Sequence, residues 1–254
     1  PDASGGGGAT DAAPAIPDAA VPIGPDAEPV PLACAGEALP TTIANPPVSI
    51  SGSILSVATL AGPEPLATAA TLEARNAGDD SLLLETSSVP GQGTNTFIIT
   101  DPNSSTTALN AYVKATATGH IDTYLFPPFD IYEDFDNALF LMFGVDLWNL
   151  VPAFAGASQS AQNGAIMVVV ADCDQNPMEN ATISLDQNVG TIRYADADGL
   201  PSTTAIATSS QGIAFVFDVP PGDYVIDAQR GGISLREHTV TTFANSASTT
   251  IIVP

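Results

Sequence analysis

Basic side chains are scarce in this sequence. Its 254 residues include five Lys and Arg residues against 28 Asp and Glu residues, which gives a formal net charge of -23 at pH 7. Because phosphate recognition depends on clustered Lys and Arg, this balance excludes nucleic acid as an expected partner. It also disfavours anionic membrane surfaces and favours divalent cations or cationic partners.

Long apolar runs are missing as well. No run reaches the roughly 18 residues that a membrane-spanning helix needs, so we expect no transmembrane segment. The chain opens without a methionine, and we therefore expect a mature, secreted form from which a targeting segment has been removed. Hydrophobic residues still make up 44% of the chain, enough to fill the cores of two modest domains.

Side chains that carry catalysis are few. His120 and His238 are the only histidines, and neither belongs to a Gly-x-Ser-x-Gly motif or lies near a cysteine in the sequence. His-Glu-x-x-His, Cys-x-x-Cys and phosphate-binding glycine loops are also missing. We therefore predict that the protein is not an enzyme and needs no cofactor.

Cys34 and Cys173 are the only cysteines. A secreted location favours a disulfide between them, because oxidising compartments preserve such bonds. The bond would close a loop of about 140 residues and stabilise the fold by roughly 4 to 5 kcal/mol through the entropy of the unfolded chain. The alternative is a pair of unrelated thiols.

Residues 1–44 form a low-complexity segment of Pro, Ala, Asp and Gly, in which Pro-Asp-Ala recurs at Pro1, Pro17 and Pro25. Such a segment cannot bury enough apolar surface to offset its ordering entropy, so we predict an extended tether. It resembles the Asp-Ala-Pro tethers that follow the lipidated cysteine in surface lipoproteins of myxobacteria and related bacteria. This sequence lacks that cysteine, which leaves lipid anchoring open.

After the tether the sequence changes to short β-type runs separated by Gly, Pro, Asn and Asp, a spacing typical of an antiparallel sandwich. The alternation in "IAFVFDV" predicts that Ile213, Phe215, Phe217 and Val219 share one core-facing side. The strands predicted for the C-terminal half are 165–172, 181–186, 191–195, 203–209, 213–219, 223–229, 233–243 and 248–253.

Two stretches of the C-terminal half carry a family pattern. Residues 172–185, "DCDQNPMENATISL", resemble an opening that reads Asp-x-x-Gly-x-Pro-Leu-x-Gly-Ala-x-Val, and "TSSQGIAFVFDVPPGDYVIDAQ" resembles a second signature of the same family. That family is the carboxypeptidase regulatory-like domain, a transthyretin-like seven-stranded β-sandwich. The resemblance covers roughly residues 164–254 and implies a fold rather than a function. The second signature falls on Gly212, Phe215, Pro221, Gly222 and Tyr224.

The Pro-Pro-Gly sequence before Tyr224 predicts a rigid corner. Pro221 presets φ and Gly222 accepts positive φ, so we expect the corner to fix the register of residues 213–219 against residues 223–229. A loop that contacts a ligand is the alternative.

A more degenerate copy of the same pattern occurs earlier in the sequence, before residue 126. In "EPLATAATLEA" (residues 64–74), Pro65 and Leu66 correspond to Pro177 and Met178. The sequence therefore predicts an all-β chain of two tandem antiparallel seven-stranded β-sandwiches, which are transthyretin-like and span residues 45–125 and 164–254.

Residues 126–163 are predicted to be an aromatic-rich linker with a short helix that opens at Asp146. The stretch 126–157 holds six of the ten Phe residues and the only Trp. These aromatics are expected to fill the groove between the sandwiches and fix their angle. Alternatively, Phe140, Phe143 and Trp148 form a subunit interface or an apolar ligand site.

Two acidic clusters, "DADG" (196–199) and "DCDQN" (172–176), place oxygen ligands two residues apart, as calcium loops do. Neither continues into a full EF-hand pattern. Asp196 and Asp198 are the candidate calcium ligands, and the alternative is a chance pair of surface carboxylates.

Two function classes follow from these features. The first is a non-catalytic structural or adhesive protein of the bacterial cell exterior that self-associates into a fibre or layer, through the tether or the aromatic linker. An extended segment of a neighbouring chain can cover an open sheet edge. The second is an extracellular module that binds a polysaccharide or another polymer, which would require exposed aromatic platforms. The apolar anchors of the tether are Val21, Ile23, Val30 and Leu32.

Overall fold

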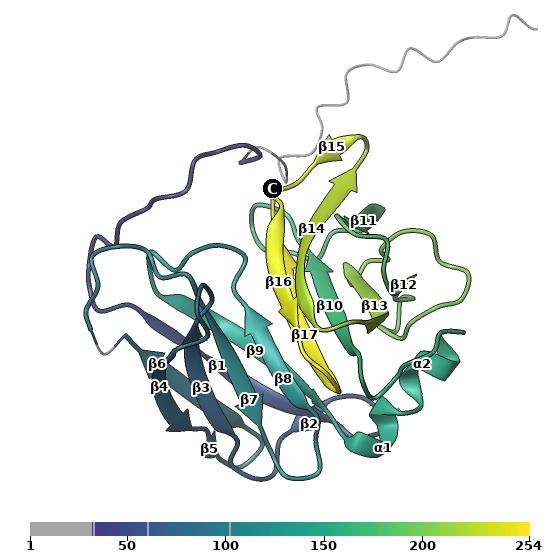
Figure 1. Ribbon diagram of the computed structural model, residues 1–254, viewed down its shortest axis with the longest axis horizontal. Helices are drawn as coiled ribbons and strands as arrows, with labels where there is room; N and C mark the ends of the chain where they lie inside the picture. The colour runs from purple at the N-terminus through teal and green to yellow at the C-terminus, as the bar shows by residue number, and fades with distance from the viewer. Residues whose placement is uncertain (1–31, 33, 60, 102) are drawn as a thin grey trace, which may run out of the picture. The chain divides into compact units, whose positions relative to one another are not determined.

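The computed structural model describes residue 32 and residues 34–59, 61–101 and 103–254. This part of the chain is all-β apart from two short helices, and the all-β sandwich prediction is confirmed (Figure 1). Neither helix in the described part has the length and hydropathy needed to span a membrane. The predicted anchors Val21, Ile23 and Val30 lie outside the described residues.

The N-terminal half, residues 34–143, holds the strands β1 to β9. β-branched, aromatic and alternating apolar residues favour these strands. Their bounds are β1 Ser49–Val57, β2 Glu64–Pro65, β3 Thr71–Asn76, β4 Leu82–Ser87, β5 Val89–Pro90, β6 Asn95–Thr100, β7 Ala111–Thr116, β8 Asp122–Phe126 and β9 Phe135–Phe143.

The C-terminal half, residues 144–254, holds two helices and the strands β10 to β17. Residues 203–209 form no strand. Thr208 of this stretch hydrogen-bonds to a neighbouring segment, and its Oγ1 donates to the Met178 carbonyl over 2.7 Å. The bounds are α1 Val145–Trp148, α2 Val151–Phe154, β10 Gly164–Val170, β11 Ala181–Leu185, β12 Thr191–Tyr194, β13 Ile213–Val219, β14 Gly222–Arg230, β15 Ile233–Ser234, β16 His238–Thr242 and β17 Ser246–Ile252.

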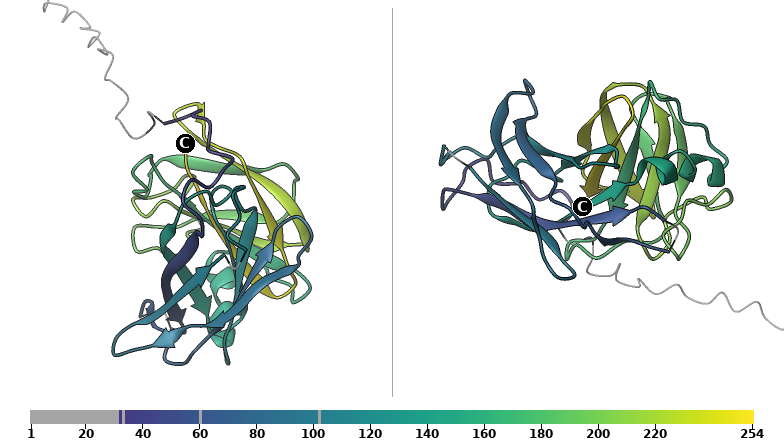
Figure 2. Two further views of the ribbon diagram at one scale, coloured as in Figure 1. Left: turned by 90° about the vertical axis from the view of Figure 1, so that its left-hand side faces the viewer. Right: turned by 90° about the horizontal axis from the view of Figure 1, so that it is seen from below.

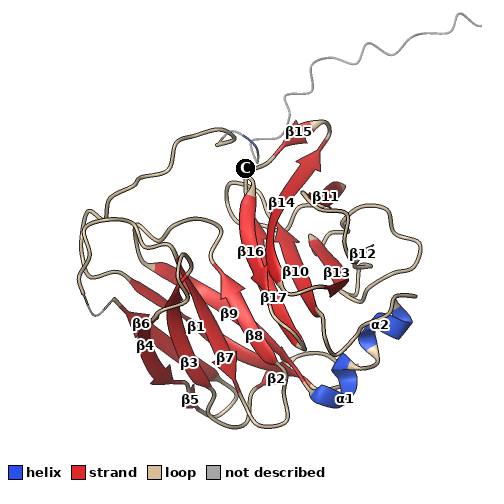
Figure 3. Cartoon of the chain, viewed as in Figure 1, coloured by secondary structure: helices blue, strands red, loops and turns tan. Residues whose placement is uncertain are grey.

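One eight-stranded sheet runs through both halves in the order β12-β13-β10-β17-β8-β7-β3-β4 (Figure 3). The halves join where β17 pairs in parallel with β8, from Ser246 opposite Asp122 to Thr250 opposite Phe126. Two further pairs are parallel, β10 with β17 and β1 with β9. The last strand of the chain therefore lies inside this sheet, and the predicted tandem sandwiches share a sheet.

Two smaller sheets cover opposite faces of the eight-stranded sheet (Figures 1 and 2). The five-stranded sheet packs on β8, β7 and β3 around Ile54, Leu72 and Val113, and it consists of β2, β1, β6, β5 and β9. The four-stranded sheet packs on β10 and β13 around Val168 and Ile226, and it consists of β11, β14, β15 and β16. The helices cover the remaining face of β10, β13 and β17, where Trp148 meets Met167 and Phe215.

The predicted linker, residues 126–163, contains a strand as well as the helices. β9 pairs with β1 along seven residue positions, from Ile50 opposite Phe135 to Val57 opposite Phe143. This close approach requires Gly52, because a Cβ there would overlap the Ala138 carbonyl oxygen. The segment therefore completes the N-terminal half before the chain crosses to the C-terminal half.

The Pro-Pro-Gly corner connects two sheets instead of two paired strands, so the predicted register between residues 213–219 and 223–229 was wrong. β13 belongs to the eight-stranded sheet and β14 to the four-stranded sheet. The Tyr224 hydroxyl donates to the Pro220 carbonyl over 3.0 Å, and the Thr242 hydroxyl donates to the same oxygen over 2.6 Å. These bonds fix the corner where the chain changes sheets.

Just before this corner, Asp218 adopts a φ of 61° and the pairing of β13 with β10 shifts register. This bulge turns Val219 to the opposite face. Phe215 and Phe217 therefore pack under the helices, whereas Val219 joins the core below the four-stranded sheet. The predicted single face for all four β13 residues was wrong because a β-bulge breaks the period of two.

Candidate functional site

A group of charged and aromatic side chains lies on the face of β3, β7 and β8 that the five-stranded sheet does not cover. Alternation along the strands brings them together, since Leu72, Val113 and Leu125 point to the opposite, buried face. In the strand register, Arg75 lies opposite Tyr112 and Lys114 lies between Glu73 and Tyr124. We call Glu73, Arg75, Asp80, Tyr112, Lys114 and Asp122 the polar seam.

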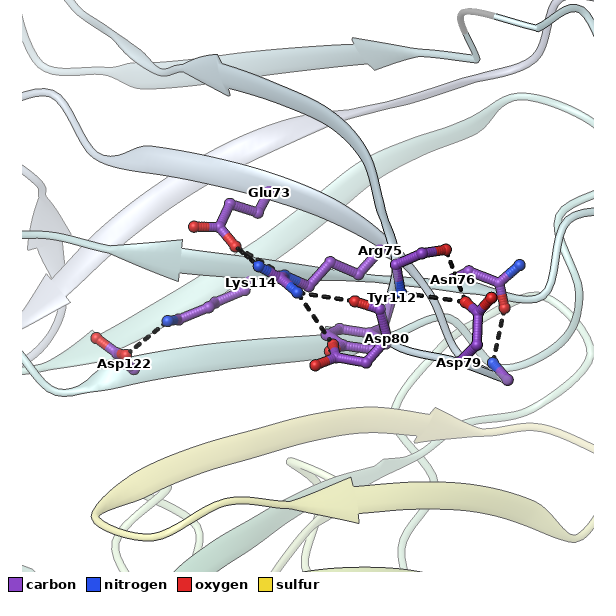
Figure 4. Close-up of polar contacts among 10 residues, drawn as sticks. Glu73, Arg75, Asn76, Asp79, Asp80, Tyr112, Lys114 and Asp122 are labelled. Atoms are coloured by element: carbon purple, nitrogen blue, oxygen red, sulfur yellow. Dashed lines mark hydrogen bonds and ion pairs between the residues drawn. The ribbon is translucent and has the colours of Figure 1, made fainter.

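Arg75 is the centre of the seam (Figure 4). Its Nε donates to Glu73 Oε2 over 2.7 Å, and its Nη1 donates to the Asp80 carbonyl over 2.8 Å. The Asp80 carboxylate also accepts a hydrogen bond from the Tyr112 hydroxyl. The turn after β3 is thus tied to β7 by hydrogen bonds to a charged group, which are stronger than neutral ones.

Lys114 is the only lysine of the sequence and lies near the junction of the halves. Its Nζ is 3.0 Å from Asp122 Oδ2 and 5.7 Å from the centre of the Tyr124 ring. Tyr124 in turn stacks on Phe243 with ring centres 4.0 Å apart. The seam therefore continues through aromatic contacts into the C-terminal half.

Burial and charge shift the pKa values of the seam. Burial, together with the hydrogen bond to Asp80, raises the pKa of the Tyr112 hydroxyl. Burial acts to lower the pKa of Lys114, but the hydrogen bond to Asp122 and the neighbouring tyrosine and carboxylates raise it overall. At neutral pH Tyr112 is therefore a donor and Lys114 a cation, so the seam is held by paired charges.

A polar cavity of about 250 Å³ lies beside the seam, between the loop after β8 and the start of β16. Its lining includes Phe126, Phe129, Asp130, Glu237 and His238. Burial lowers the pKa of His238 to about 4, so its imidazole is neutral at pH 7. Its Nε2 is buried and has no hydrogen-bond partner among the described residues. The cavity is large enough for a small polar molecule or several waters.

Cys34 and Cys173 are joined by a disulfide whose Cα atoms are 5.9 Å apart. Residues 34–44, which the sequence assigned to the tether, lie against both halves. The Glu37 carbonyl accepts a hydrogen bond from Arg236 Nη2 over 2.8 Å, and the Ile43 amide donates to the Thr106 carbonyl over 2.9 Å. The disulfide therefore fastens the start of the described chain to the end of β10.

Asp196 and Asp198 lie in a tight turn after β12. The Asp196 Oδ1 accepts hydrogen bonds from the amides of Asp198 and Leu200, each over 3.0 Å. No three His, Cys, Asp or Glu side chains converge as a metal site in the part of the chain that the structure describes. The Asp196 carboxylate thus stabilises the turn, and among the described residues no third acidic, His or Cys side chain joins Asp196 and Asp198 as a candidate calcium ligand.

The remaining predicted interface residues are buried in their own chain. Leu32 is 9% exposed and packs in the core of the C-terminal half. Phe140 is fully buried beside Phe97 in the N-terminal half. Phe143 and Trp148 pack against each other and against β10 and β13, with ring centres 5.7 Å apart. These four side chains are therefore core residues, and Phe143 and Trp148 lie where the two halves meet.

Sequence reasoning missed the polar seam. A usable signal was present, because two of the five basic residues occur in Glu73-x-Arg75 and Tyr112-x-Lys114, which alternate with small apolar residues. Such spacing predicts a polar face on a strand whose other face is buried. The pairing of these two strands with each other is set only by the fold.

Comparison with known proteins identifies no family. No family model and no curated protein matches the chain. Solved structures that align with it include the Bacillus anthracis TIE protein, at 15% identity and a TM-score of 0.26 over 82% of this chain and 34% of that one. The streptococcal ancillary pilin aligns at 11% identity and a TM-score of 0.26, over 82% of this chain and 68% of that one. The shaft pilin SpaA from Lactobacillus rhamnosus GG aligns at 10% identity and a TM-score of 0.24, over 82% and 98%.

Proposed function

We propose that this protein is a structural or adhesive component of the bacterial cell exterior and that it self-associates into a fibre or layer. The eight-stranded sheet that both halves share is the observation that carries the proposal. Because β17 is hydrogen-bonded to β10 on one side and to β8 on the other, the halves cannot separate without breaking a ladder inside the sheet. Two halves that are joined by one continuous sheet suit a subunit of a fibre or layer.

Aromatic burial favours this proposal over the polymer-binding alternative. A sugar-binding surface needs aromatic rings on an accessible face. Of the Phe, Tyr and Trp residues in the described part of the chain, Phe154 alone is classed as exposed, at 55%. Phe140, Phe143 and Trp148 of the predicted linker instead lie in the cores and the junction.

We propose that residues 1–31 supply the assembly contact. The shared sheet ends in the edge strands β4 and β12, whose outer backbone groups can pair with an extended segment. Leu32 is held in the core of its own chain, so the anchors available to a neighbouring copy are Val21, Ile23 and Val30. Prolines in this segment remove backbone donors, so pairing would be interrupted.

Deletion of residues 1–31 tests this proposal, because it leaves Leu32 and the disulfide in place. We expect the full chain to form ordered assemblies in electron micrographs and high-mass species in light scattering, and the deletion variant to be monomeric. A full-length variant with Val21, Ile23 and Val30 changed to Ser is the control that keeps the length of the segment. If the full chain is itself monomeric, or the deletion variant forms the same assemblies, the tether is not an assembly element.

A further inference from the structure

Ser56 and His120 form a hydrogen-bonded pair that the sequence separates by 64 positions. The Ser56 Oγ lies 2.7 Å from the His120 Nε2. Ser56 is the second-last residue of β1, and His120 lies in the turn between β7 and β8. The pair therefore bridges the five-stranded and the eight-stranded sheets at one end of the N-terminal half.

The second ring nitrogen of His120 fixes the direction of this hydrogen bond. His120 Nδ1 lies 3.1 Å from the Thr118 carbonyl oxygen, which can only accept a hydrogen bond. Nδ1 therefore carries the proton in the neutral ring, and Nε2 presents its lone pair. It follows that the Ser56 hydroxyl donates to Nε2, which is the arrangement from which a histidine removes a proton.

We propose that Ser56 is a histidine-activated nucleophile that accepts acyl groups from small esters. Nucleophile and base are recognised by a separation of about 2.6 to 3.2 Å and by a third group that orients the base. The pair meets both conditions, with the Thr118 carbonyl as the group that positions His120. This inference is independent of the proposed structural role, and it departs from the prediction, made from the sequence motifs, that the protein is not an enzyme.

The surroundings of the pair define the class of ester. Ser56 and His120 are half-buried, and Ala58, Thr118 and Gly119 beside them are exposed, so the pair lies close to the protein surface. Glu64 lies directly opposite Ser56 in the β1–β2 pair and is exposed. Its carboxylate, in a protein of net charge -23, repels anionic acyl donors. Neutral and cationic esters are therefore the expected substrates.

The proposed reaction is an acyl transfer that needs no cofactor. Ser56 Oγ attacks the carbonyl carbon of the ester while its proton passes to His120 Nε2. The tetrahedral intermediate then loses its alkoxide, which takes that proton and leaves as an alcohol, and the acyl group remains as an ester of Ser56. Attack by water on this ester, with His120 again as base, would release the acid and restore the hydroxyl.

A neutral alkyl fluorophosphonate tests the pair, because it forms a Ser–O–P bond with loss of fluoride and the hydroxyl proton when a base activates the serine. We expect one adduct per chain in intact-protein mass spectra and its location on the Ser56 peptide after digestion. Ser56→Ala should abolish labelling. His120→Gln retains a hydrogen-bonding side chain without a comparable base, and should slow labelling by about 100-fold or more.

Ser53→Ala, on the same strand, is the matched control and should label like the parent protein. Thermal melts of all variants show whether the fold persists, and peptide mapping of the parent protein keeps the test valid where a variant fails to fold. A parent protein that stays unlabelled, an adduct on another residue, or a His120→Gln variant that reacts as fast as the parent would each overturn the proposal. The Ser56–His120 contact would then be a structural link between the sheets.

Discussion

Asp172 and Asp196 occupy the same position in two copies of one turn. Each Oδ1 accepts hydrogen bonds from the amides two and four residues ahead, over 2.9 Å for Asp172 and 3.0 Å for Asp196. Each turn closes with a bridge to a proline, Ala171 with Pro177 and Ala195 with Pro201. The two clusters that resembled calcium loops are therefore copies of an Asp-stabilised turn at the ends of β10 and β12.

Removal of divalent cations should leave stability unchanged, because backbone amides already engage the carboxylates of these turns. We expect the same melting temperature with and without EDTA, within about 2 °C. Asp196→Ala should destabilise by about 1 kcal/mol through the loss of two backbone hydrogen bonds, and Asp198→Asn should be near neutral. A loss of more than about 10 °C in EDTA would show that a bound cation stabilises the fold.

The disulfide should be complete in the purified protein. Thiol titration of the unfolded, unreduced chain is expected to find no free thiol, and two thiols after reduction. The bond closes a sequence separation of 139 residues. Cys34→Ala with Cys173→Ala should therefore lower the free energy of unfolding by up to about 5 kcal/mol, measured by urea denaturation. Two free thiols before reduction would contradict this expectation.

Gly52→Ala should disrupt the pairing of β1 with β9. The added Cβ would overlap the Ala138 carbonyl oxygen, so the strands must move apart. We expect a loss of about 2 to 3 kcal/mol in the free energy of unfolding. Ser53→Ala adds no atoms on the same strand and should change stability by less than about 0.5 kcal/mol. Equal melting temperatures for the two variants would show that β9 does not approach Gly52 this closely.

Acid should destabilise the protein through His238. Burial lowers its folded-state pKa from 6.5 to about 4, so between these values the unfolded chain binds the proton more readily than the folded chain. Stability contributed by the neutral ring is complete above pH 6.5 and is lost as the pH falls towards 4. The loss by pH 4.5 amounts to about 2 to 3 kcal/mol.

His238→Gln is the control for this effect, because glutamine does not titrate. We expect its stability to fall less than that of the parent protein between pH 7 and pH 4.5, when both are measured by urea denaturation in the same buffers. Carboxylates such as Asp130 and Glu237 line the same cavity in both proteins, so their contribution cancels. Parallel curves for the two proteins would show that His238 keeps an ordinary pKa.

Much of the secondary structure was determined by the sequence alone. The strand predicted at residues 213–219 is β13 to the residue, and most of the other predicted strands differ by a few residues at their ends. Local alternation and turn residues are sufficient for this, because they act between near neighbours. Two predictions were wrong. Residues 203–209 form no strand, since there Thr208 makes its hydrogen bonds to residues far away in the sequence in place of a ladder, and the predicted strand 233–243 is divided into β15 and β16.

Tertiary structure decided how these strands combine. The sequence of β17 alone does not determine that this strand lies between β10 and β8. One extended apolar strand can pair with many others, in either direction. The burial of Phe140 and Trp148 and the meeting of Ser56 with His120 depend on that arrangement in the same way. Contacts between residues far apart in the chain are selected by the joint packing of whole sheets, which no local pattern encodes.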